Sequence, residues 1–378
     1  MRILVLNHEF PPIGGGGGRA AEHICQTLAK RGYEIEVLTS HLEGLTREED
    51  RDGYHITRVP CKRTQPFKAS FLSMGLYVLA GLWAARRYIR VSRPDLIHVH
   101  FAVPAGPLAW MLSKIYGIPY VLTAHLGDVP GGTPEKTGGW FRFVFPFTRP
   151  IWRGASAIVA VSEFTRGLAL KHYNEEIQVI PNGVDLDAPN PDNICVSQTP
   201  RIVFAGRFMV QKAPVQIVRV LKELKELPWE CVMIGDGPLM EDVKAEIHAS
   251  GLEDRFKLPG WVEPAQVLEL FEKSDILFMP SLSEGLPVVG VQALSKGLAI
   301  VASQIGGFLD LVEQGKNGYM EEVGNTDRFV VRLRELLLDR EKLLDFRRAS
   351  LEKAREFDIN RVVDAYEKVF TKVLSVGK

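Results

Sequence analysis

Short apolar segments rich in β-branched residues alternate with longer helical patterns along most of the chain. Such alternation is typical of a parallel sheet that helices cover on both faces. In the first half it predicts strands at 2–7, 34–39, 55–59, 96–100, 120–123, 157–161 and 177–180. The helical patterns between them cover 19–30, 70–90, 104–116 and 163–172. This half is therefore expected to form one doubly wound domain.

The segment 187–200 interrupts the alternation, because it is rich in Pro, Asn and Asp and has no periodicity, which predicts a linker. Beyond it, strands are predicted at 201–205, 231–234, 256–258, 276–279 and 299–302. The matching helices are 215–227, 239–249, 264–273, 287–296 and 326–338. We therefore expect an α/β protein with two Rossmann-like domains, 1–186 and 201–357, whose strand carboxyl ends face each other across a cleft. An amphipathic helix within 358–378 is expected to pack back on the first domain.

Composition narrows the class of protein without naming an activity. The 378 residues carry 46 basic and 46 acidic side chains and are 46% hydrophobic, which excludes disordered and collagen-like chains. The four cysteines lie far apart, which argues against a structural zinc site or a redox dithiol. No apolar run is long enough to span a membrane, and no signal peptide is recognisable, so a cytoplasmic location is expected.

Five consecutive glycines, 14–18, follow the first predicted strand and lead into a helix. Glycines let the backbone approach a ligand closely, and a helix N-terminus offers free N–H groups to an anion, so the segment predicts a phosphate-binding loop. A nicotinamide or flavin site and a plain flexible loop are the alternatives. The second predicted strand ends in Thr39 and Ser40 and not in the acid that holds an adenosine ribose, which argues against the dinucleotide.

Three histidines, His8, His100 and His125, fall at the predicted carboxyl ends of strands, where a doubly wound sheet binds ligands. For His100, and for His98 near it, the preferred explanation is that they cap a strand with hydrogen bonds. His125 differs because Asp128 and a glycine lie beside it on one loop. An imidazole and a carboxylate together can orient hydroxyl groups or relay a proton.

Two cations, Arg207 and Lys212, follow the first strand of the second half. Fixed cations this close on one loop suit a diphosphate leaving group that no metal neutralises, although a solvated surface pair is the simpler explanation. Later in the chain Ser283, Glu284 and Gly285 precede a helix that Pro287 opens, and the N–H groups of that helix would face phosphate oxygens.

In this combination the chain resembles the family 4 retaining glycosyltransferases of the GT-B fold over nearly its whole length. Further matching segments are the double glycine at 15–16, the strand 95–101 (DLIHVHF), Ser162 with Glu163, 181–185 (PNGVD), 235–238 (GDGP), and 306–307 followed by Gly318. The resemblance implies that Arg207 and Lys212 hold the donor diphosphate and that His125 touches the sugar. The other donor-binding residues that it implies are Gly15, Gly16, Gly235, Gly237, Glu284, Gly285, Leu286, Pro287, Val288 and Gln292.

Gln292 departs from the family pattern, which has a second glutamate there that accepts hydrogen bonds from both ribose hydroxyls. An amide oxygen still accepts, but without the charge that strengthens such bonds. The sequence Asp185-Leu186-Asp187 matches the Asp-x-Asp of metal-dependent glycosyltransferases, but it falls at the predicted linker, and we interpret it as coincidence. We expect no metal and no cofactor beyond the nucleoside diphosphate sugar.

An uncharged run, 71–85, stands between basic residues, and no acid occurs from 54 to 94. The basic residues of that stretch are Arg58, Lys62, Arg63, Lys68, Arg86, Arg87, Arg90 and Arg93. A second acid-free stretch, 140–153, mixes Arg142, Arg149 and Arg153 with aromatic residues. Apolar and basic residues in this pattern suit a membrane interface, while a buried helix with solvated ends is the alternative. Nucleic acid is not expected, because no nucleic-acid module is present and the chain is neutral.

These observations predict a metal-independent, retaining transferase that moves a sugar from a UDP- or GDP-linked donor to an acceptor hydroxyl of a lipid or lipid-linked saccharide. Its catalytic residues would be Glu284, His125, Asp128, Arg207 and Lys212. A peripheral position on the inner face of a membrane is the matching expectation for location. Two alternatives stay open: a sugar-nucleotide epimerase of the same fold, and a non-catalytic nucleotide-sugar binding protein.

Overall fold

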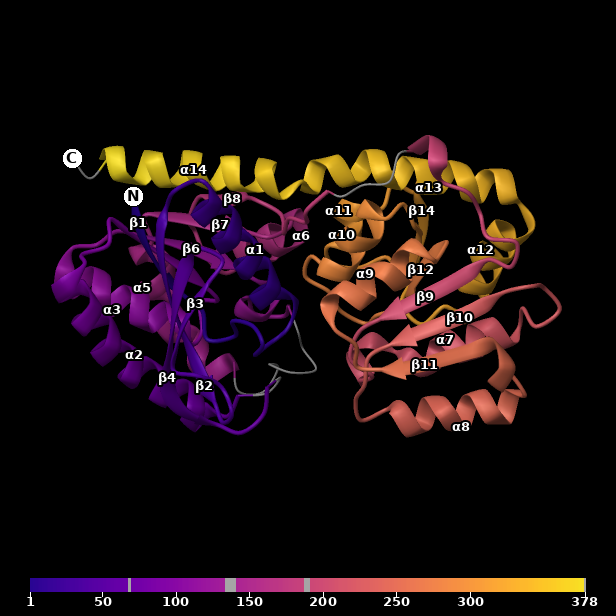
Figure 1. Cartoon of the computed structure of the whole chain (residues 1–378), viewed down its shortest axis with the longest axis horizontal. Helices are drawn as coiled ribbons and strands as arrows, with labels where there is room; N and C mark the ends of the chain where they lie inside the picture. Colours follow the sequence, from indigo (N-terminus) through magenta and orange to yellow (C-terminus); the bar gives the residue numbers. More distant parts are fainter. Residues whose placement is uncertain (67–68, 133–140, 187–190, 377–378) are drawn as a thin grey trace. The chain divides into compact units, whose positions relative to one another are not determined.

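The computed structural model describes residues 1–66, 69–132, 141–186 and 191–376. The chain forms two compact units, one made of 1–183 and 359–378 and the other of 184–358 (Figure 1). Residues 184–186 and 191–200 therefore group with the second unit, and 187–190 lie outside the described residues. The C-terminal helix α14 (Ile359–Val376) groups with the first unit, so the chain returns to its starting unit at its end.

The first unit is built on an eight-stranded sheet in the order β3-β4-β2-β1-β5-β6-β7-β8. All neighbouring strands are parallel except β3 and β4, which form an antiparallel hairpin at one edge. The strands are β1 (Arg2–Leu6), β2 (Glu34–Leu42), β3 (Glu48–Arg51), β4 (Tyr54–Arg63), β5 (Leu96–His100), β6 (Tyr120–Ala124), β7 (Ala157–Ala160) and β8 (Ile177–Val179).

Helices cover both faces of this sheet, and this explains why residues 3–6 of β1 are all apolar. Leu4 and Leu6 join a core with helices on one face, whereas Ile3 and Val5 join a core with α1 and α14 on the other. Successive side chains of a strand point to opposite faces, so a doubly covered strand needs apolar residues throughout. The helices of the unit are α1 (Gly16–Lys30), α2 (Phe71–Val91), α3 (Ala105–Tyr116), α5 (Phe141–Gly154), α6 (Glu163–Leu170) and α14.

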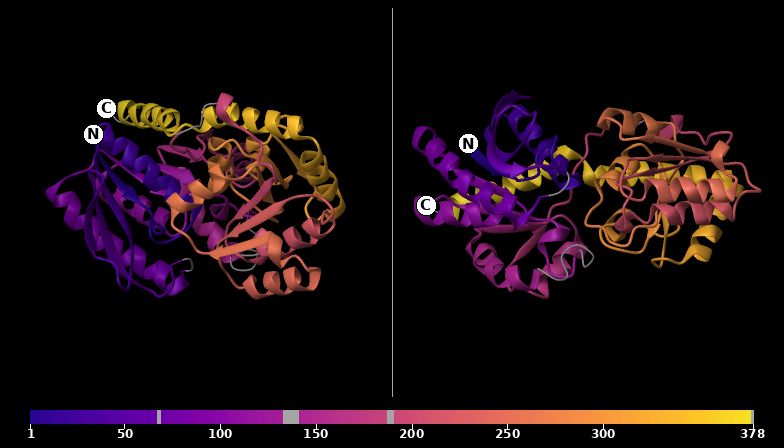
Figure 2. Two further views of the ribbon diagram at one scale, coloured as in Figure 1. Left: turned by 45° about the vertical axis from the view of Figure 1, so that its right-hand side comes forward. Right: turned by 90° about the horizontal axis from the view of Figure 1, so that it is seen from below.

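Helices α1 and α14 lie side by side on the same face of the first sheet, as the views of Figure 1 and Figure 2 agree. Arg31, at the C-terminus of α1, donates hydrogen bonds to the carboxylates of Asp364 (2.6 Å) and Glu367 (2.7 Å) on α14. Buried side chains of α14, among them Tyr366 and Phe370, complete the core beneath. The C-terminal helix is therefore an integral layer of the first unit.

The second unit has a six-stranded parallel sheet in the order β11-β10-β9-β12-β13-β14. Its strands are β9 (Arg201–Ala205), β10 (Glu230–Ile234), β11 (Phe256–Gly260), β12 (Ile276–Met279), β13 (Ala299–Ser303) and β14 (Gly318–Glu321). Its helices are α7 (Pro214–Lys222), α8 (Met240–Ser250), α9 (Pro264–Glu272), α10 (Val288–Ser295), α11 (Phe308–Leu311), α12 (Thr326–Leu338) and α13 (Arg340–Ala354). Both units are thus doubly wound, as the sequence predicts.

The strand orders locate a topological switch point in each sheet. In the first sheet the strands that follow β1 are added on one side, from β2 to β4. The chain then crosses to the other side of β1, where β5 to β8 are added in the opposite direction. In the second sheet β9 and β12 are the corresponding pair. Ligands of open α/β sheets bind outside the carboxyl ends of strands at such points. Within the residues described, no helix combines the length and the apolar character needed to cross a bilayer.

Candidate functional site

In the second unit, the loops that carry the predicted donor-binding residues leave the sheet at its switch point. Arg207 and Lys212 follow β9, and Glu284 follows the neighbouring strand β12. Because parallel strands β9 and β12 are hydrogen-bonded neighbours, their carboxyl ends deliver both loops to the same place. The structure therefore brings together a set of residues that the sequence separates by more than seventy positions.

The two loops are joined by an ion pair. Lys212 Nζ donates to Glu284 Oε1 at 2.5 Å, and the two side chains are 17% and 6% exposed. Gln211, a residue that sequence reasoning missed, adds two hydrogen bonds: its side-chain Nε2 donates to Ser283 O at 3.0 Å, and its backbone carbonyl accepts from the Leu282 N–H at 2.8 Å. The β9 and β12 loops are thus held as one assembly.

Glycines behind these loops are required by close backbone packing. A Cβ on Gly306 would overlap the Glu284 carbonyl oxygen, and one on Gly307 would overlap that of Gly285. The N–H of Gly307 also donates to Gly285 O. Gly235 has φ +125°, and a Cβ there would overlap Gly206 O. The glycines that the resemblance singles out therefore set the positions of Glu284 and of the loop beginning at Gly206.

Helix α10 starts next to Glu284. Pro287 occupies the N-cap position, one residue before the helix that the sequence predicts it to open, and no side chain caps the first turn. The N–H groups of Val288 and Val289 precede the first bonds within the helix, which Gly290 and Val291 donate to Pro287 O, and N–H groups in this position can bind an anion. Leu286 and Val288 beside Pro287 are buried. Gln292 lies one turn further along and is half-buried.

The first unit gathers histidines at its own switch point. His8 follows β1, His100 ends β5 and His125 follows β6, and all three side chains are buried. His125 Nε2 lies 3.5 Å from His100 Nδ1. Burial lowers the pKa of His125 to about 4, so its imidazole is neutral at pH 7. A neutral imidazole can donate through one nitrogen and accept through the other.

His98 and His100 belong to the interior of the unit, in line with the explanation preferred from the sequence. His98 Nε2 lies 2.9 Å from Thr123 Oγ1, and that hydroxyl is 3.1 Å from the Tyr366 hydroxyl on α14. Burial, reinforced by the neighbouring His125, lowers the pKa of His98 to about 3. His98 thus links β5 and β6 to the C-terminal helix.

Asp128 faces backbone and not the open side of the site. Its Oδ2 accepts from the His125 N–H at 2.8 Å, and its Oδ1 accepts from the Val103 N–H at 3.4 Å. Burial raises the pKa of the Asp128 carboxyl to about 7. The carboxyl therefore fastens the loops that follow β5 and β6 to each other, a geometry suited to positioning His125 and not to relaying a proton to substrate.

The glycine-rich segment is held in place by its surroundings. Helix α1 begins at Gly16, three residues before the predicted start, and Gly15 is its N-cap with open space around it. The Gly14 N–H donates to Pro66 O at 2.8 Å. The buried Arg63 donates to His8 O (3.3 Å) and Pro66 O (3.0 Å). Arg63 thus stabilises the segment around the loop through these hydrogen bonds, which argues against a plain flexible loop.

Helix α2 presents a second candidate surface. Leu72, Leu79 and Trp83 form a stripe along one side of the helix that continues into Arg86 and Arg90. Leu79 is 67% and Trp83 68% exposed, so this stripe is not covered by the core of the unit. The opposite side of α2, which includes Tyr77 and Ala85, is buried. The alternative of a buried helix with solvated ends is therefore wrong for α2, because Leu79 and Trp83 in its middle are exposed, although its opposite side packs on the core.

Several residues of the predicted basic and aromatic stretches do not belong to that surface. Arg58 on β4 is buried and ion-paired with Glu49 (2.7 Å), and Arg63, at the end of the same strand, is buried and bonded to His8 O and Pro66 O beside the glycine-rich loop. Trp152 on α5 is buried and stacked on Tyr173, whereas Phe147, Arg149 and Arg153 are exposed. Lys68 and Trp140, and the side chain of Arg142, lie outside the described residues.

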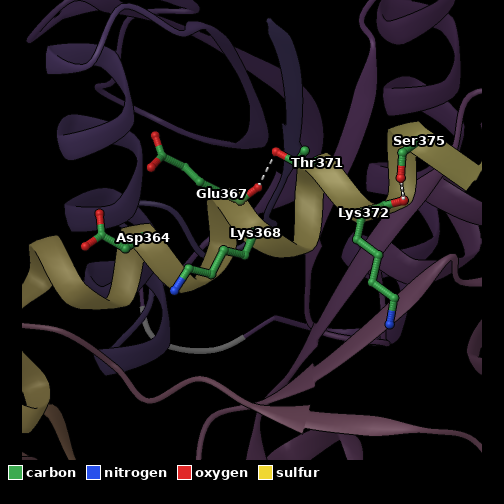
Figure 3. Close-up of a pocket in the computed structure, with 6 residues that line it drawn as sticks. All are labelled: Asp364, Glu367, Lys368, Thr371, Lys372 and Ser375. Carbon is green, nitrogen blue, oxygen red and sulfur yellow. Dashed lines mark hydrogen bonds between the residues drawn. The ribbon is translucent and has the colours of Figure 1, made fainter.

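An open pocket of about 630 Å³ lies along α14 (Figure 3). Its lining residues all come from this helix: Asp364, Glu367, Lys368, Thr371, Lys372 and Ser375. Thr371 and Ser375 donate to backbone carbonyls of the helix, and Arg31 holds both acids. Across the part of the chain that the structure describes, no three His, Cys, Asp or Glu side chains gather as metal ligands. Asp187 of the Asp-x-Asp sequence is outside that part.

Two doubly wound units of this kind define the GT-B architecture of glycosyltransferases. Sucrose-phosphate synthase from Thermosynechococcus elongatus matches with a TM-score of 0.87 at 15% identity, over 99% of both chains. HepE of Anabaena, solved in complex with UDP and glucose, matches with a TM-score of 0.77 at 19% identity, over 98% of this chain and 100% of HepE.

Sequence comparison identifies the family. The model described as Glycosyltransferase Family 4 matches residues 14–188, and Glycosyl transferases group 1 matches 192–353. TuaC of Bacillus subtilis (strain 168), named as a teichuronic acid biosynthesis glycosyltransferase, is 29% identical over 338 residues, 82% of this chain and 83% of TuaC. The chain belongs to glycosyltransferase family 4 and is a glycosyltransferase that uses a nucleotide-sugar donor. The comparisons do not favour an epimerase or a non-catalytic binding protein.

Proposed function

We propose that this glycosyltransferase is retaining and metal-independent and takes its sugar from a UDP- or GDP-linked donor. The observation that carries the proposal is the pair of loops at the second switch point, where Arg207 and Lys212 follow one strand and Glu284 the next. Two fixed cations supply the positive charge that a diphosphate leaving group needs. The UDP in the HepE complex supports a nucleoside diphosphate as the leaving group.

In the proposed reaction, the acceptor hydroxyl attacks the anomeric carbon from the face that the diphosphate leaves. The bond from carbon to the acceptor oxygen forms, the bond from carbon to the diphosphate oxygen breaks, and the acceptor proton passes to the departing oxygen. Arg207, Lys212 and the N–H groups that open α10 stabilise the developing negative charge. Glu284 accepts hydrogen bonds from sugar hydroxyls, together with backbone groups at Gly285.

The first unit would contribute His125 and the glycine-rich segment. We assign a sugar hydroxyl to the neutral imidazole of His125, and donor phosphate oxygens to the N–H groups at Gly15 and Gly16. Asp128 acts as a positioning residue, because its two oxygens accept from backbone N–H groups beside His125. In the second unit, Gly235 and Gly237 allow the loop that carries Arg207 to pack closely.

The test is a transfer assay with UDP- and GDP-sugars in which NMR follows the anomeric configuration of the product. We expect retention of configuration and turnover that survives EDTA, because protein cations replace a metal. An inverted product would exclude the retaining mechanism, and loss of activity in EDTA that Mn²⁺ or Mg²⁺ restores would exclude metal independence. Conversion of the donor sugar without any acceptor would instead identify an epimerase.

Gln292→Glu is expected to tighten the nucleotide by about tenfold, or about 1.4 kcal/mol, if residue 292 meets the ribose. Four residues of helix separate Val288 from Gln292, a rise of about 6 Å that suits a ribose next to a diphosphate at the helix N-terminus. A carboxylate accepts from both ribose hydroxyls, whereas the amide accepts through one oxygen only.

Calorimetry with UDP and with its 2′-deoxy counterpart measures this effect. The variant should gain affinity for UDP and little for the deoxynucleotide, which lacks one of the two hydroxyls. An unchanged or weaker affinity for UDP would show that residue 292 does not contact the ribose.

We propose that the acceptor is a lipid or lipid-linked saccharide and that α2 docks on an anionic membrane. The apolar stripe of Leu72, Leu79 and Trp83 would enter the interface while Arg86 and Arg90 meet lipid headgroups. Apolar side chains continue into basic ones along one side of the helix. This arrangement supports a lipid surface over a protein partner.

We expect the chain to co-sediment with phosphatidylglycerol vesicles at low ionic strength and to be released partly by salt. Each basic side chain at an anionic surface contributes about 1 kcal/mol, so changing Arg86, Arg87 and Arg90 to Gln should lower vesicle binding roughly a hundredfold. Trp83→Ser should remove the binding that survives salt. Neutral phosphatidylcholine vesicles should not retain the protein.

The matched control changes Lys222, Lys225 and Lys244 to Gln, which removes three exposed cations from the second unit. This variant should bind vesicles like the wild type, and both triple variants should keep their affinity for UDP. A wild type that ignores anionic vesicles at low salt would remove the support for a lipid acceptor and favour a soluble one.

A further inference from the structure

Phe101 is one of three described non-glycine residues of the first unit, with Asp52 and Lys62, whose backbone lies in the left-handed region, and its φ is +72°. Only a few per cent of non-glycine residues adopt this conformation, and those that do concentrate at functional sites. Phe101 directly follows β5, at the switch point, and its N–H donates to Thr123 O at 3.1 Å. The conformation turns the chain out of the sheet immediately after His100.

The Phe101 ring is held from three sides. It stacks on the His125 imidazole, with centroids 4.3 Å apart and planes 25° apart, and the edge of His8 packs against it at 5.5 Å. On the third side a Cβ built on Gly17 of α1 would lie 2.6 Å from Phe101 Cζ and 3.2 Å from His125 Nδ1 and Cε1. The ring therefore packs tightly between the glycine-rich segment and His125, and a side chain at position 17 would overlap it.

We propose that Phe101 is a positioning residue whose ring, clamped against Gly17, fixes the plane of the His125 imidazole for contact with the donor sugar. The proposal rests on the function proposed above only for the role of His125. The clamp acts together with His100, whose Nδ1 lies 3.5 Å from His125 Nε2, so that rotation of the imidazole is opposed by a stacked ring and by a polar neighbour.

The same ring keeps water from the imidazole, and this gives the proposal a readout other than activity. The titratable groups around His125 are His100 and His98 on β5 and Asp128 on η1 (Leu126–Asp128), while α1 presents the uncharged Gly17. His8 lies on the other side of the Phe101 ring. Since burial is the cause that lowers the pKa of His125 to about 4, uncovering the imidazole should raise that pKa toward its ordinary value.

The experiment uses the full chain with isotope-labelled histidine, and NMR follows the His125 imidazole as pH changes. Phe101→Leu keeps an apolar side chain but removes the flat ring, and Gly17→Ala pushes the ring away from the opposite side. For both variants we expect the His125 titration midpoint to rise by at least one pH unit and the transfer rate to fall at least tenfold, and Phe101→Leu should keep its affinity for UDP. Phe101→Tyr retains the ring but adds a hydroxyl at Cζ, the atom that faces Gly17, so it should raise the midpoint and slow transfer as Gly17→Ala does.

Leu112→Ala is the matched control, because it removes a buried side chain of the same unit far along α3 from the clamp. It should lower the unfolding temperature without moving the His125 midpoint. An unchanged midpoint and rate in both Phe101→Leu and Gly17→Ala, each verified as folded, would overturn the proposal. A wild type that transfers no sugar would contradict the proposed function, whereas the NMR titration would still decide whether the clamp exists.

Discussion

Replacing Lys212 by Met is expected to lower kcat by a hundred- to a thousandfold, and Arg207→Ala by a similar factor. Removing one preorganised group that stabilises transition-state charge costs about 3–4 kcal/mol. Because both cations would act on the leaving diphosphate, the loss should appear in kcat and kcat/KM alike. Lys244→Met is the control, since Lys244 also pairs with a carboxylate of the second unit, Glu241 at 2.8 Å, but on the exposed surface of α8.

The ion pair between Lys212 and Glu284 allows a double variant that separates the effect of Lys212 on catalysis from its effect on stability. Lys212→Met alone leaves the buried Glu284 carboxylate without its partner, and breaking a buried pair in this way costs about 3–5 kcal/mol of stability. Adding Glu284→Gln removes the uncompensated charge. The double variant should therefore recover most of the lost unfolding free energy while its kcat stays low. A double variant that recovers activity together with stability would show that Lys212 serves the fold and not the leaving group.

The fold could be predicted because its strands are buried on both faces. Residues 3–6 of β1, 97–99 of β5 and 276–279 of β12 are nearly unbroken apolar runs, and only a doubly covered parallel sheet needs such runs. The elements that sequence reading missed have weaker patterns. β3 (EEDR) is a polar edge strand, and β14 (GYME) has a glycine and an acid at its ends. α5 contains Pro146 and Pro150, and α13 (Arg340–Ala354) is mostly charged and polar.

The residues of the candidate site could be named from the sequence, but their partners could not. Arg207, Lys212 and Glu284 stand in recognisable segments, whereas the contact between Lys212 and Glu284 depends on which strands are neighbours in the sheet. The order β10-β9-β12 is a property of the topology and is not encoded in any local pattern. For the same reason Gln211, which ties the two loops together, carries no sequence signal.

The burial of individual side chains also could not be predicted from the sequence. Arg58, Arg63, Arg86 and Arg90 all belong to the same acid-free basic stretch, yet the first two are buried on β4 and the last two are exposed on α2. Phe101 shows the limit most clearly, since neither its positive φ nor its stacking on His125 follows from its position after a strand. Such features arise where chain segments meet, and they concentrate at the switch points.

The first unit is expected to lose stability steeply as pH falls below about 6.5, the ordinary pKa of histidine. Burial lowers the pKa of His8 and His98 to about 3 and of His125 to about 4, and it lowers that of His100 well below its usual value. Arg63 adds to the effect at His8, and neighbouring imidazoles add to it at His98 and His100.

The sign follows from proton binding. Below pH 6.5 the unfolded chain protonates these four imidazoles and the folded unit does not, so their contribution to stability is complete above pH 6.5 and is lost as pH falls toward the folded values. Asp128 opposes them, because its raised pKa of about 7 lets the folded state hold one proton that the unfolded chain releases above its ordinary value. A net uptake of about three protons on unfolding corresponds to a slope of at most about 4 kcal/mol per pH unit.

Buried cysteines allow the unfolding of each unit in urea to be followed separately. Cys25 reports on the first unit and Cys231 on the second. A disulfide reagent that reacts with thiols in acid labels each cysteine once it is exposed, and mass spectrometry identifies the labelled site. Between pH 7.5 and pH 5.5 the urea midpoint for Cys25 should fall well below that for Cys231. His98→Leu should reduce the slope by about one proton, whereas His248→Ala, an exposed histidine of α8, should not change it. Equal midpoints for Cys25 at both pH values would mean that the four imidazoles are not held neutral in the folded unit.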